Sequence, residues 1–452
     1  MTKFRLFAAA AALTVALSGC GGDRGPDKTV LTKEDFTNPP VSKNPLVDYT
    51  KWSVHDGKFF LDGKWVFIKT AKPLTDFPDP GCCQRVIDFL DILREKHYNA
   101  VSLDLSWSNF DRDGDGVVDV SVEPLIRLID AIYDRGMYPC LCLEDYAVGG
   151  GRLPEGFWEQ YPDAYAINSA GQRVTDTEYG FGSKVVSLFH DGYLEKSRSF
   201  IKDLLSKIDC RKILFFETNV EPQYMGSIKL CYSDAAKAKY AAWRKANGIT
   251  DKDSEMPEGF PVPDSFVSNP VWNKFRAQYL ASWVNGDAEA IRSVAGKDAR
   301  IAVDYLDAGE SSMMLRCGIP EEFLRSLTCA NIIQVNWHWY FPERKPNDKA
   351  YERVHKIMAE TGRDWAITEH MTFNGSDYGF STEVLDAVLE NTLHQGTRFG
   401  WDFTNTFNRN TDAFSLYNND WSPKRTIKNV DDNWGYWMYR VKKIESEING
   451  NN

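Results

Sequence analysis

Two carboxylates follow apolar runs that have the composition of buried strands. Glu221 lies in the segment FFETNVEPQY, and Glu369 lies in the segment AITEHMTF. A pair of carboxyl groups suits cleavage of a glycosidic bond, because one protonates the leaving oxygen while the other attacks the sugar or activates water. The two residues are far apart in the sequence, so only the fold can bring them together. The alternatives for Glu221 are a solvated loop carboxylate and a charge at a helix N-terminus, and the alternative for Glu369 is an ion pair with an arginine.

Aromatic and hydrogen-bonding side chains follow several of the same apolar runs. Aromatic faces hold the apolar side of a sugar ring, while Asn, His and Tyr bond its hydroxyls. The expected substrate-binding residues are Asn219, Trp107, Asn336, His338, Tyr340 and Trp401. Core packing is the alternative for His338 and for the tryptophans. Glu217 would lie deeper in its strand, where a buried carboxylate must be paired, and we expect a structural role.

These groups need a scaffold, and short apolar strands alternate with amphipathic helices along the chain. The predicted strands are Val66–Thr70, Ala100–Leu105, Tyr138–Leu143, Ile213–Glu217, Arg300–Asp304, Ile332–Asn336, Trp365–Thr368 and Thr397–Trp401. The predicted helices are Gln84–Lys96, Pro124–Arg135, Tyr193–Lys207, Ala235–Ala246, Pro270–Val294, Glu321–Leu327, Lys349–Thr361 and Glu383–Gln395. This order predicts a single α/β domain, a (β/α)8 TIM barrel, whose catalytic groups lie where the strands end. An open doubly wound sheet is disfavoured, because the chain has no GxGxxG turn.

The segment SVHDGKFFLDGKW (53–65) predicts a hairpin with its turn at Asp62-Gly63. It could cap the bottom of the barrel. The catalytic domain is expected to span residues 46–452. The net charge is −11, which argues against nucleic acid and against an anionic membrane surface as partners.

The N-terminus predicts a secretory signal. Lys3 and Arg5 precede an apolar run that is too short to span a membrane. The following Leu-Ser-Gly-Cys resembles a bacterial lipobox, with Cys20 as the lipidated residue. Residues 1–20 are then the signal peptide, and 21–45 are a flexible tether. We expect a lipid-anchored protein at the cell surface or in the periplasm, which touches the membrane through its anchor alone.

The remaining cysteines do not have the spacing of a zinc site, and buried free thiols are expected for most of them. The segment DRDGDGVVD has the first half of a calcium loop. Its candidate ligands are Asp111, Asp113, Asp115 and Asp119. The twelfth position is Val122 rather than a bidentate Glu, so a solvated acidic turn is the alternative.

The chain resembles the clan A glycoside hydrolases, which are retaining (β/α)8 enzymes. FETNVEP resembles the FELLNEP-type signature of family 5, which implies an acid/base role for Glu221. AITEH resembles the strand-7 segment, which implies a nucleophile role for Glu369. YNAVSLDLSW resembles the strand-2 segment, and WHWY resembles the strand-6 His-x-Tyr. Residues 157–173 and 231–249 look like segments of family 42.

Three departures from the pattern imply an outlying family. The Asn that normally precedes the acid/base is replaced by Val220, and Asn219 comes one position earlier. Strand alternation would point Asn219 and Glu221 to one side and Val220 to the other. The strand-2 Arg is absent, with Leu103 or Asp104 near its place. Of the zinc-binding Cys cluster of family 42, only Cys231 remains.

The resemblance implies a retaining β-glycoside hydrolase that needs no cofactor. Its substrate would be a β-linked hexoside or polysaccharide fragment, such as a β-galactoside, β-mannoside or β-glucan. Retention requires the two carboxyl groups about 5–5.5 Å apart. Two alternatives stay open: a catalytically inactive carbohydrate-binding lipoprotein on the same barrel, and a metal-dependent barrel hydrolase. The chain has no His-x-His or His-His-Asp pattern to support the second.

Overall fold

The computed structural model describes residues 46–55, 58–66, 68, 70–95, 98–146, 153–175, 184–219, 221–224, 230–260, 262, 269–306, 310–339, 348–363, 366–373 and 401–408. Along 366–373 and 401–408, and at 336–339, the backbone alone is described. The predicted signal, tether and lipidated Cys20 lie outside these residues, as do Tyr340 and the predicted helix Glu383–Gln395. Residues 38–452 form one unit by their contacts.

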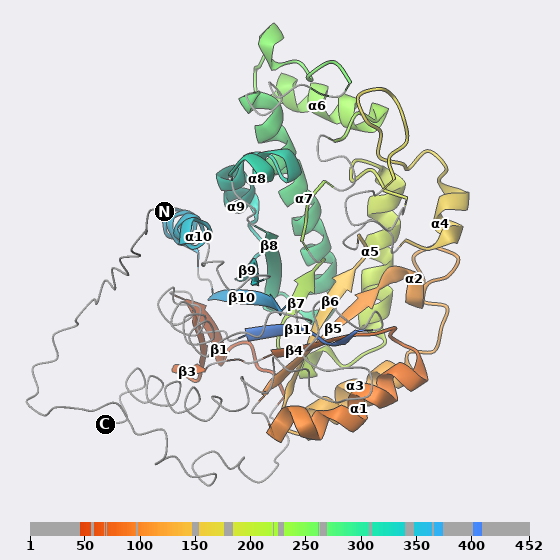
Figure 1. The fold of residues 1–452 in the computed structure, drawn as a ribbon, viewed down its shortest axis with the longest axis vertical. Coiled ribbons are helices and arrows are strands. Elements are labelled where there is room, and N and C mark those ends of the chain that lie inside the picture. Colours follow the sequence, from red (N-terminus) through yellow and green to blue (C-terminus); the bar gives the residue numbers. More distant parts are fainter. Residues whose placement is uncertain are drawn as a thin grey trace, which may run out of the picture. The chain divides into compact units, whose positions relative to one another are not determined.

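Eight parallel strands close into a barrel (Figure 1). In chain order they are β4 (Thr70–Leu74), β5 (Ala100–Ser106), β6 (Tyr138–Glu144), β7 (Phe216–Thr218), β8 (Ile301–Leu306), β9 (Ile332–Trp339), β10 (Ala366–Phe373) and β11 (Trp401–Asn408). Each strand pairs with the next, and β11 closes the ring on β4. The predicted (β/α)8 fold is confirmed.

Helices connect the successive strands from β4 to β10. They are α1 (Pro80–Glu95), α2 (Trp107–Phe110), α3 (Glu123–Asp134), α4 (Glu155–Gln160), α5 (Asp191–Ser206), α6 (Asp234–Ala246), α7 (Pro270–Ala295), α8 (Glu310–Arg316), α9 (Pro320–Ser326) and α10 (Asp348–Thr361). Short 3₁₀ turns lie at Cys210–Lys212 and Lys252–Ser254. Among the described helices, none combines the length and the apolar character that a membrane crossing requires.

Alternation along the strands separates two cores. On β5, Leu103 and Leu105 share a hydrophobic cluster with Phe89 and Leu90 of α1, so they face the helices. Ala100 belongs instead to a second hydrophobic cluster, which lies in the barrel. Asp104 lies four residues after Ala100 on the same strand. Because side chains alternate along a strand, Asp104 faces the same interior side as Ala100.

A three-stranded antiparallel sheet covers the end of the barrel where the strands begin. It consists of β1 (Trp52–His55), β2 (Lys58–Leu61) and β3 (Lys64–Val66). Trp52 packs edge-on against Tyr138, the first residue of β6, with ring centroids 5.4 Å apart. The predicted turn is present, since Asp62 and Gly63 have φ of 50° and 76°, the paired positive values of a type I′ hairpin. The predicted position at the barrel bottom is confirmed.

Three predicted strands are displaced. The first barrel strand begins at Thr70, whereas we predicted Val66–Thr70, because the apolar residues up to Val66 pair with β2. The fourth strand is Phe216–Thr218 rather than Ile213–Glu217, and the last begins at Trp401 rather than ending there. Apolar composition alone does not distinguish a strand from the buried segment beside it.

Candidate active site

The chain leaves β7 through a strained turn. The strand ends at Thr218, and Asn219 and Glu221 have φ of 54° and 48°. Positive φ at non-glycine residues costs on the order of 1–3 kcal/mol and is concentrated at functional sites. The predicted strand alternation is therefore wrong for Asn219 and Glu221, because neither has an extended backbone; Val220 lies outside the described residues.

Asn219 ties the end of β7 to the end of β6. Its side chain is fully buried, and its Oδ1 accepts hydrogen bonds from the backbone N–H groups of Asp145 and Tyr146, at 3.1 and 2.8 Å. These bonds satisfy two donors that the end of β6 would otherwise leave buried. In this arrangement the amide oxygen of Asn219 holds the scaffold, and the predicted sugar contact of Asn219 stays a prediction.

The Glu221 side chain lies beside Gln223 at the carboxyl end of the fourth barrel strand. Glu221 is 7% exposed. Gln223 Nε2 donates to its Oε2 at 3.2 Å, and Gln223 Oε1 accepts from Arg316 Nη1 at 2.5 Å. The predicted acid/base residue thus occupies the place where barrel enzymes carry catalytic groups.

A buried ion cluster lies inside the barrel. Lys72 Nζ of β4 is 3.1 Å from Asp104 Oδ1 and 3.6 Å from Glu217 Oε2. The lysine and Glu217 side chains are 2% and 1% exposed. Glu217 is therefore paired, as expected for a structural carboxylate. Lys72 was missed, because the predicted first strand ended two residues before it.

The acidic groups around Lys72 influence one another. Ser106 Oγ donates to Glu144 Oε2 at 2.8 Å on the neighbouring strand. Burial raises the pKa of Asp104 to about 7; the Lys72 ammonium opposes this rise, and the Glu144 and Glu217 carboxylates add to it. Burial thus makes Asp104 a weaker acid than an exposed aspartate, in spite of its lysine partner.

Asp104, Cys142 and Glu144 offer ligand atoms within 4.8 Å of one another, a spacing that could suit a metal ion. The Lys72 ammonium already lies 3.1 Å from Asp104, so a positive charge is supplied by the chain itself. A divalent ion at this place would have to overcome repulsion from that ammonium. We therefore assign the cluster a structural and electrostatic role.

A second buried acidic pair lies beside the end of β6. Burial raises the pKa of Asp145 to about 6, although the Asn219 and Ser197 side chains lower it. Tyr193 OH donates to Asp145 Oδ2 at 3.4 Å. Burial also raises the pKa of Asp287 on α7, and the Asp145 carboxylate adds to that rise.

Trp107 lies in the core rather than in the barrel mouth. Its side chain is fully buried, its ring is stacked on Phe200 at 5.9 Å, and its Nε1 donates to Asp111 Oδ2 at 2.7 Å. The predicted sugar contact of Trp107 is wrong, because these neighbours cover it. The core alternative describes this residue.

The other predicted site residues lie on the expected strands. Asn336 and His338 lie on β9, and Glu369 is the fourth of the eight residues of β10. Trp401 is the first residue of β11, so its predicted place at the end of that strand is wrong, because the strand begins four residues later than predicted. In the ladder, Glu369 pairs with Val335 on one side and Trp401 on the other. The carboxyl group of Glu369 is not among the described side chains, so the predicted spacing of the two catalytic carboxyls stays a prediction.

The acidic loop after α2 is ordered by its own backbone. The buried Asp111 accepts hydrogen bonds from the N–H groups of Gly114 and Gly116, at 2.7 and 2.8 Å. The exposed Asp113 and Asp115 place ligand atoms within 4.8 Å of each other and of Asp111. Asp119 Oδ2 is engaged with the N–H of Arg112 at 3.1 Å. Calcium at this loop stays a prediction.

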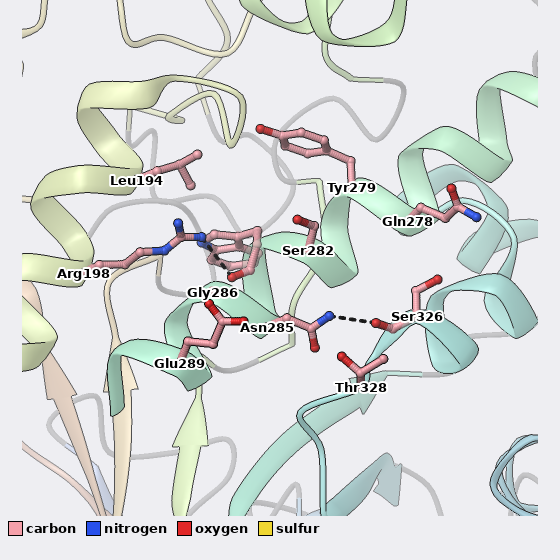
Figure 2. Close-up of a pocket in the computed structure, with 11 residues that line it drawn as sticks. Leu194, Arg198, Gln278, Tyr279, Ser282, Asn285, Gly286, Glu289, Ser326 and Thr328 are labelled. Carbon is pink, nitrogen blue, oxygen red and sulfur yellow. Dashed lines mark hydrogen bonds between the residues drawn. The ribbon is translucent and has the colours of Figure 1, made fainter. Parts of the chain in front are cut away.

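A cavity of about 430 Å³ lies outside the barrel, between α5, α7 and the end of α9 (Figure 2). Arg198 of α5 lies against Gly286 of α7, and its Nε donates to Asp287 Oδ1 at 3.2 Å. A Cβ at Gly286 would lie 2.1 Å from Arg198 Nη2, so the contact requires glycine. Asn285 donates to the Ser326 carbonyl oxygen at 2.8 Å. Because this cavity lies among the outer helices, it is separate from the predicted site.

Solved structures share this fold at low sequence identity. The catalytic domain of a β-amylase from Paenibacillus polymyxa is 13% identical with a TM-score of 0.59, and the match covers 83% of this chain and 98% of that one. A catalytic mutant of a GH42 β-galactosidase from G. stearothermophilus is 16% identical with a TM-score of 0.60, over 84% of this chain and 57% of that one. An exo-β-1,4-mannosidase from Opitutaceae bacterium strain TAV5 is 12% identical with a TM-score of 0.52, and the match covers 89% of this chain and 63% of that one.

The match spans less than two thirds of the galactosidase and mannosidase chains. No family model and no curated protein sequence matches this chain. At these identities the similarity shows a common barrel fold.

Proposed function

We propose that this protein is a retaining β-glycoside hydrolase, with Glu221 as the acid/base and Glu369 as the nucleophile. The observation that carries the proposal is the place of Glu221. It is nearly buried, lies on a strained turn and directly follows the fourth barrel strand. Glu369 lies on the seventh barrel strand, which supports the proposal because the clan A resemblance implies the nucleophile on that strand.

The proposed reaction proceeds by double displacement. The carboxylate of Glu369 attacks the anomeric carbon, while the protonated Glu221 gives its proton to the leaving oxygen and the glycosidic bond breaks. Glu221, now ionised, then takes a proton from water. The resulting hydroxide oxygen bonds the anomeric carbon and releases Glu369, which restores both groups.

The proposed substrates are β-linked hexosides or polysaccharide fragments. The names of the structural neighbours include a β-galactosidase and an exo-β-1,4-mannosidase, which supports this substrate class. β-Galactosides, β-mannosides and β-glucans are therefore the first compounds to assay. The acid/base chemistry uses groups of the chain and calls for no cofactor.

A screen of aryl β-glycosides and polysaccharides tests the proposal. We expect Glu221→Gln to lower kcat/KM about 10²–10⁴-fold, since it removes general acid–base catalysis. Glu369→Gln should lose nearly all activity, because it removes the nucleophile. Glu289→Gln, on an exposed residue of α7, is the matched control and should retain activity. Equal activity in either site variant and the wild type would refute the assignment.

One observation favours the alternative of a carbohydrate-binding barrel without catalysis. The residue before Glu221 is Val220, and the oxygen of Asn219 holds the end of β6. The residue that normally bonds the sugar next to the acid/base is thus replaced. Glycan binding measured by calorimetry, with no hydrolysis of any bound glycan, would select this alternative.

A further inference from the structure

We propose that Gln223 and Arg316 are positioning residues for Glu221, and that together they hold its carboxyl group in one orientation. This inference rests on the proposed function. The side chains form a relay from the end of α8 to the carboxylate: Arg316 donates to Gln223 Oε1, and Gln223 Nε2 donates to Glu221 Oε2. Gln223 is 1% exposed and Glu221 is 7% exposed, so the hydrogen bond between them is shielded from water, whereas Arg316 is half-buried.

The arginine fixes which end of the Gln223 amide faces Glu221. A guanidinium group can only donate hydrogen bonds, so it must face the amide oxygen. The amide nitrogen is then directed at Glu221. Without Arg316, the amide oxygen would lose its donor, and the amide could turn by 180° whenever Glu221 is protonated and can itself donate a hydrogen bond.

The backbone around the relay is held at several points. Tyr224 N donates to the Arg316 carbonyl oxygen at 2.8 Å, and the Cys317 thiol lies 3.5 Å from the Pro222 carbonyl oxygen. The turn that carries Glu221 is thus attached to the end of α8 on both sides of Gln223.

A buried cation on α7 anchors the same turn. Arg276 is fully buried, and its guanidinium lies 4.6 Å from the centre of the Tyr224 ring. It donates to the carbonyl oxygens of Leu230, Met314 and Leu315, at 2.8, 2.9 and 2.5 Å. Arg276 therefore links the segment after β7 to α8, and the relay is built on the rigid scaffold.

The relay has a chemical consequence for acid/base catalysis. A neutral N–H donor favours the ionised carboxylate, yet it does not remove the proton that the acid must deliver. The donor also aims the carboxyl group. Loss of the Gln223 donor should therefore disfavour the ionised form of Glu221 and impair proton delivery.

The test compares the pH dependence of kcat/KM in the wild type, Gln223→Met, Gln223→Glu and Arg316→Lys. Two substrates are used, a 4-nitrophenyl glycoside with a good leaving group and an alkyl glycoside with a poor one. In Gln223→Met, the basic limb of the kcat/KM profile should lie about one pH unit higher than in the wild type. Cleavage of the alkyl glycoside should fall about 10-fold or more, and that of the nitrophenyl glycoside less, since a good leaving group needs no proton.

The other variants keep the test decisive if Gln223→Met folds poorly. Gln223→Glu has the same shape and places a carboxylate beside Glu221, so it should move the basic limb further in the same direction. Arg316→Lys keeps the cation and should give a smaller shift. The proposed positioning role is wrong if the variants and the wild type have the same basic limb and the variants lose activity equally on both substrates.

Glu221→Gln in the same series separates this inference from the proposed function. If it is inactive on the alkyl glycoside while the Gln223 variants show no shift, the relay alone fails. Full activity in Glu221→Gln would instead refute the proposed function and, with it, the relay.

Discussion

At the scale of single residues, the barrel interior depends on one cation. Lys72 lies within 4 Å of carboxylate oxygens of both Asp104 and Glu217. The sequence predicted that Glu217 would be buried and paired, because a charge inside a strand needs a partner. The identity of that partner was not predictable, since the expected register left Lys72 outside the first strand.

The raised pKa of Asp104 predicts a pH-dependent stability. The folded state binds this proton more tightly than the unfolded state, in which the carboxyl group has the ordinary pKa of an exposed aspartate, about 3.9. The contribution of Asp104 to the free energy of unfolding should therefore fall as the pH rises from about 4 to about 7, and level off above that.

Urea unfolding of the wild type and of Asp104→Asn at several pH values checks this prediction. The wild type should lose stability relative to the variant between pH 4.5 and pH 7, because Asn carries no titrating proton. Asp88→Asn, at an exposed residue on α1, is the control for a general effect of net charge. If the difference in unfolding free energy between the wild type and Asp104→Asn stays constant across this range, the pKa of Asp104 is not raised in the folded state.

At the scale of elements, regular periodicity was predictable and local backbone geometry was not. The strands β5 and β6 and the helices α3, α5 and α7 lie within about two residues of their predicted bounds, because their apolar patterns are strong. The turn after β7 was predicted as extended. Positive φ at Asn219 and Glu221 has no signal in the sequence, since no glycine marks it.

The acidic loop gives an element-scale prediction. We expect calcium to raise the Tm of the wild type relative to the protein in a chelator, because a ligand that binds the folded state stabilises it. Asp113→Asn/Asp115→Asn removes two charges from the exposed ligands but keeps side-chain oxygens that can accept the N–H bonds of Asp115 and Val117. This double variant should fold and lose the calcium shift in calorimetry.

A wild-type Tm that is equal in calcium and in chelator would identify the loop as a solvated acidic turn. The backbone N–H bonds to Asp111 would then account for its order without a metal. Magnesium at the same concentration is the control for ionic strength, since its smaller octahedral shell fits this loop poorly.

At the scale of the whole molecule, the two ends of the barrel differ in role. The sheet β1–β3 closes the end where the strands begin, with Trp52 against Tyr138. The opposite end carries Glu221 and the exits of β6 and β7. This division is the one that barrel enzymes use, with stability at one end and chemistry at the other. The eight-strand order was predictable from the sequence, because alternating strands and helices leave few other topologies.

The central claim is that Glu369 is the nucleophile of a retaining enzyme. The most direct test is incubation with a 2-deoxy-2-fluoro β-glycoside that has a good leaving group, followed by intact mass measurement and peptide mapping. We predict one added fluoroglycosyl group per chain, attached to Glu369, and no label in Glu369→Gln. A label on another carboxylate, or turnover of the natural substrate with inverted anomeric configuration, would contradict the account.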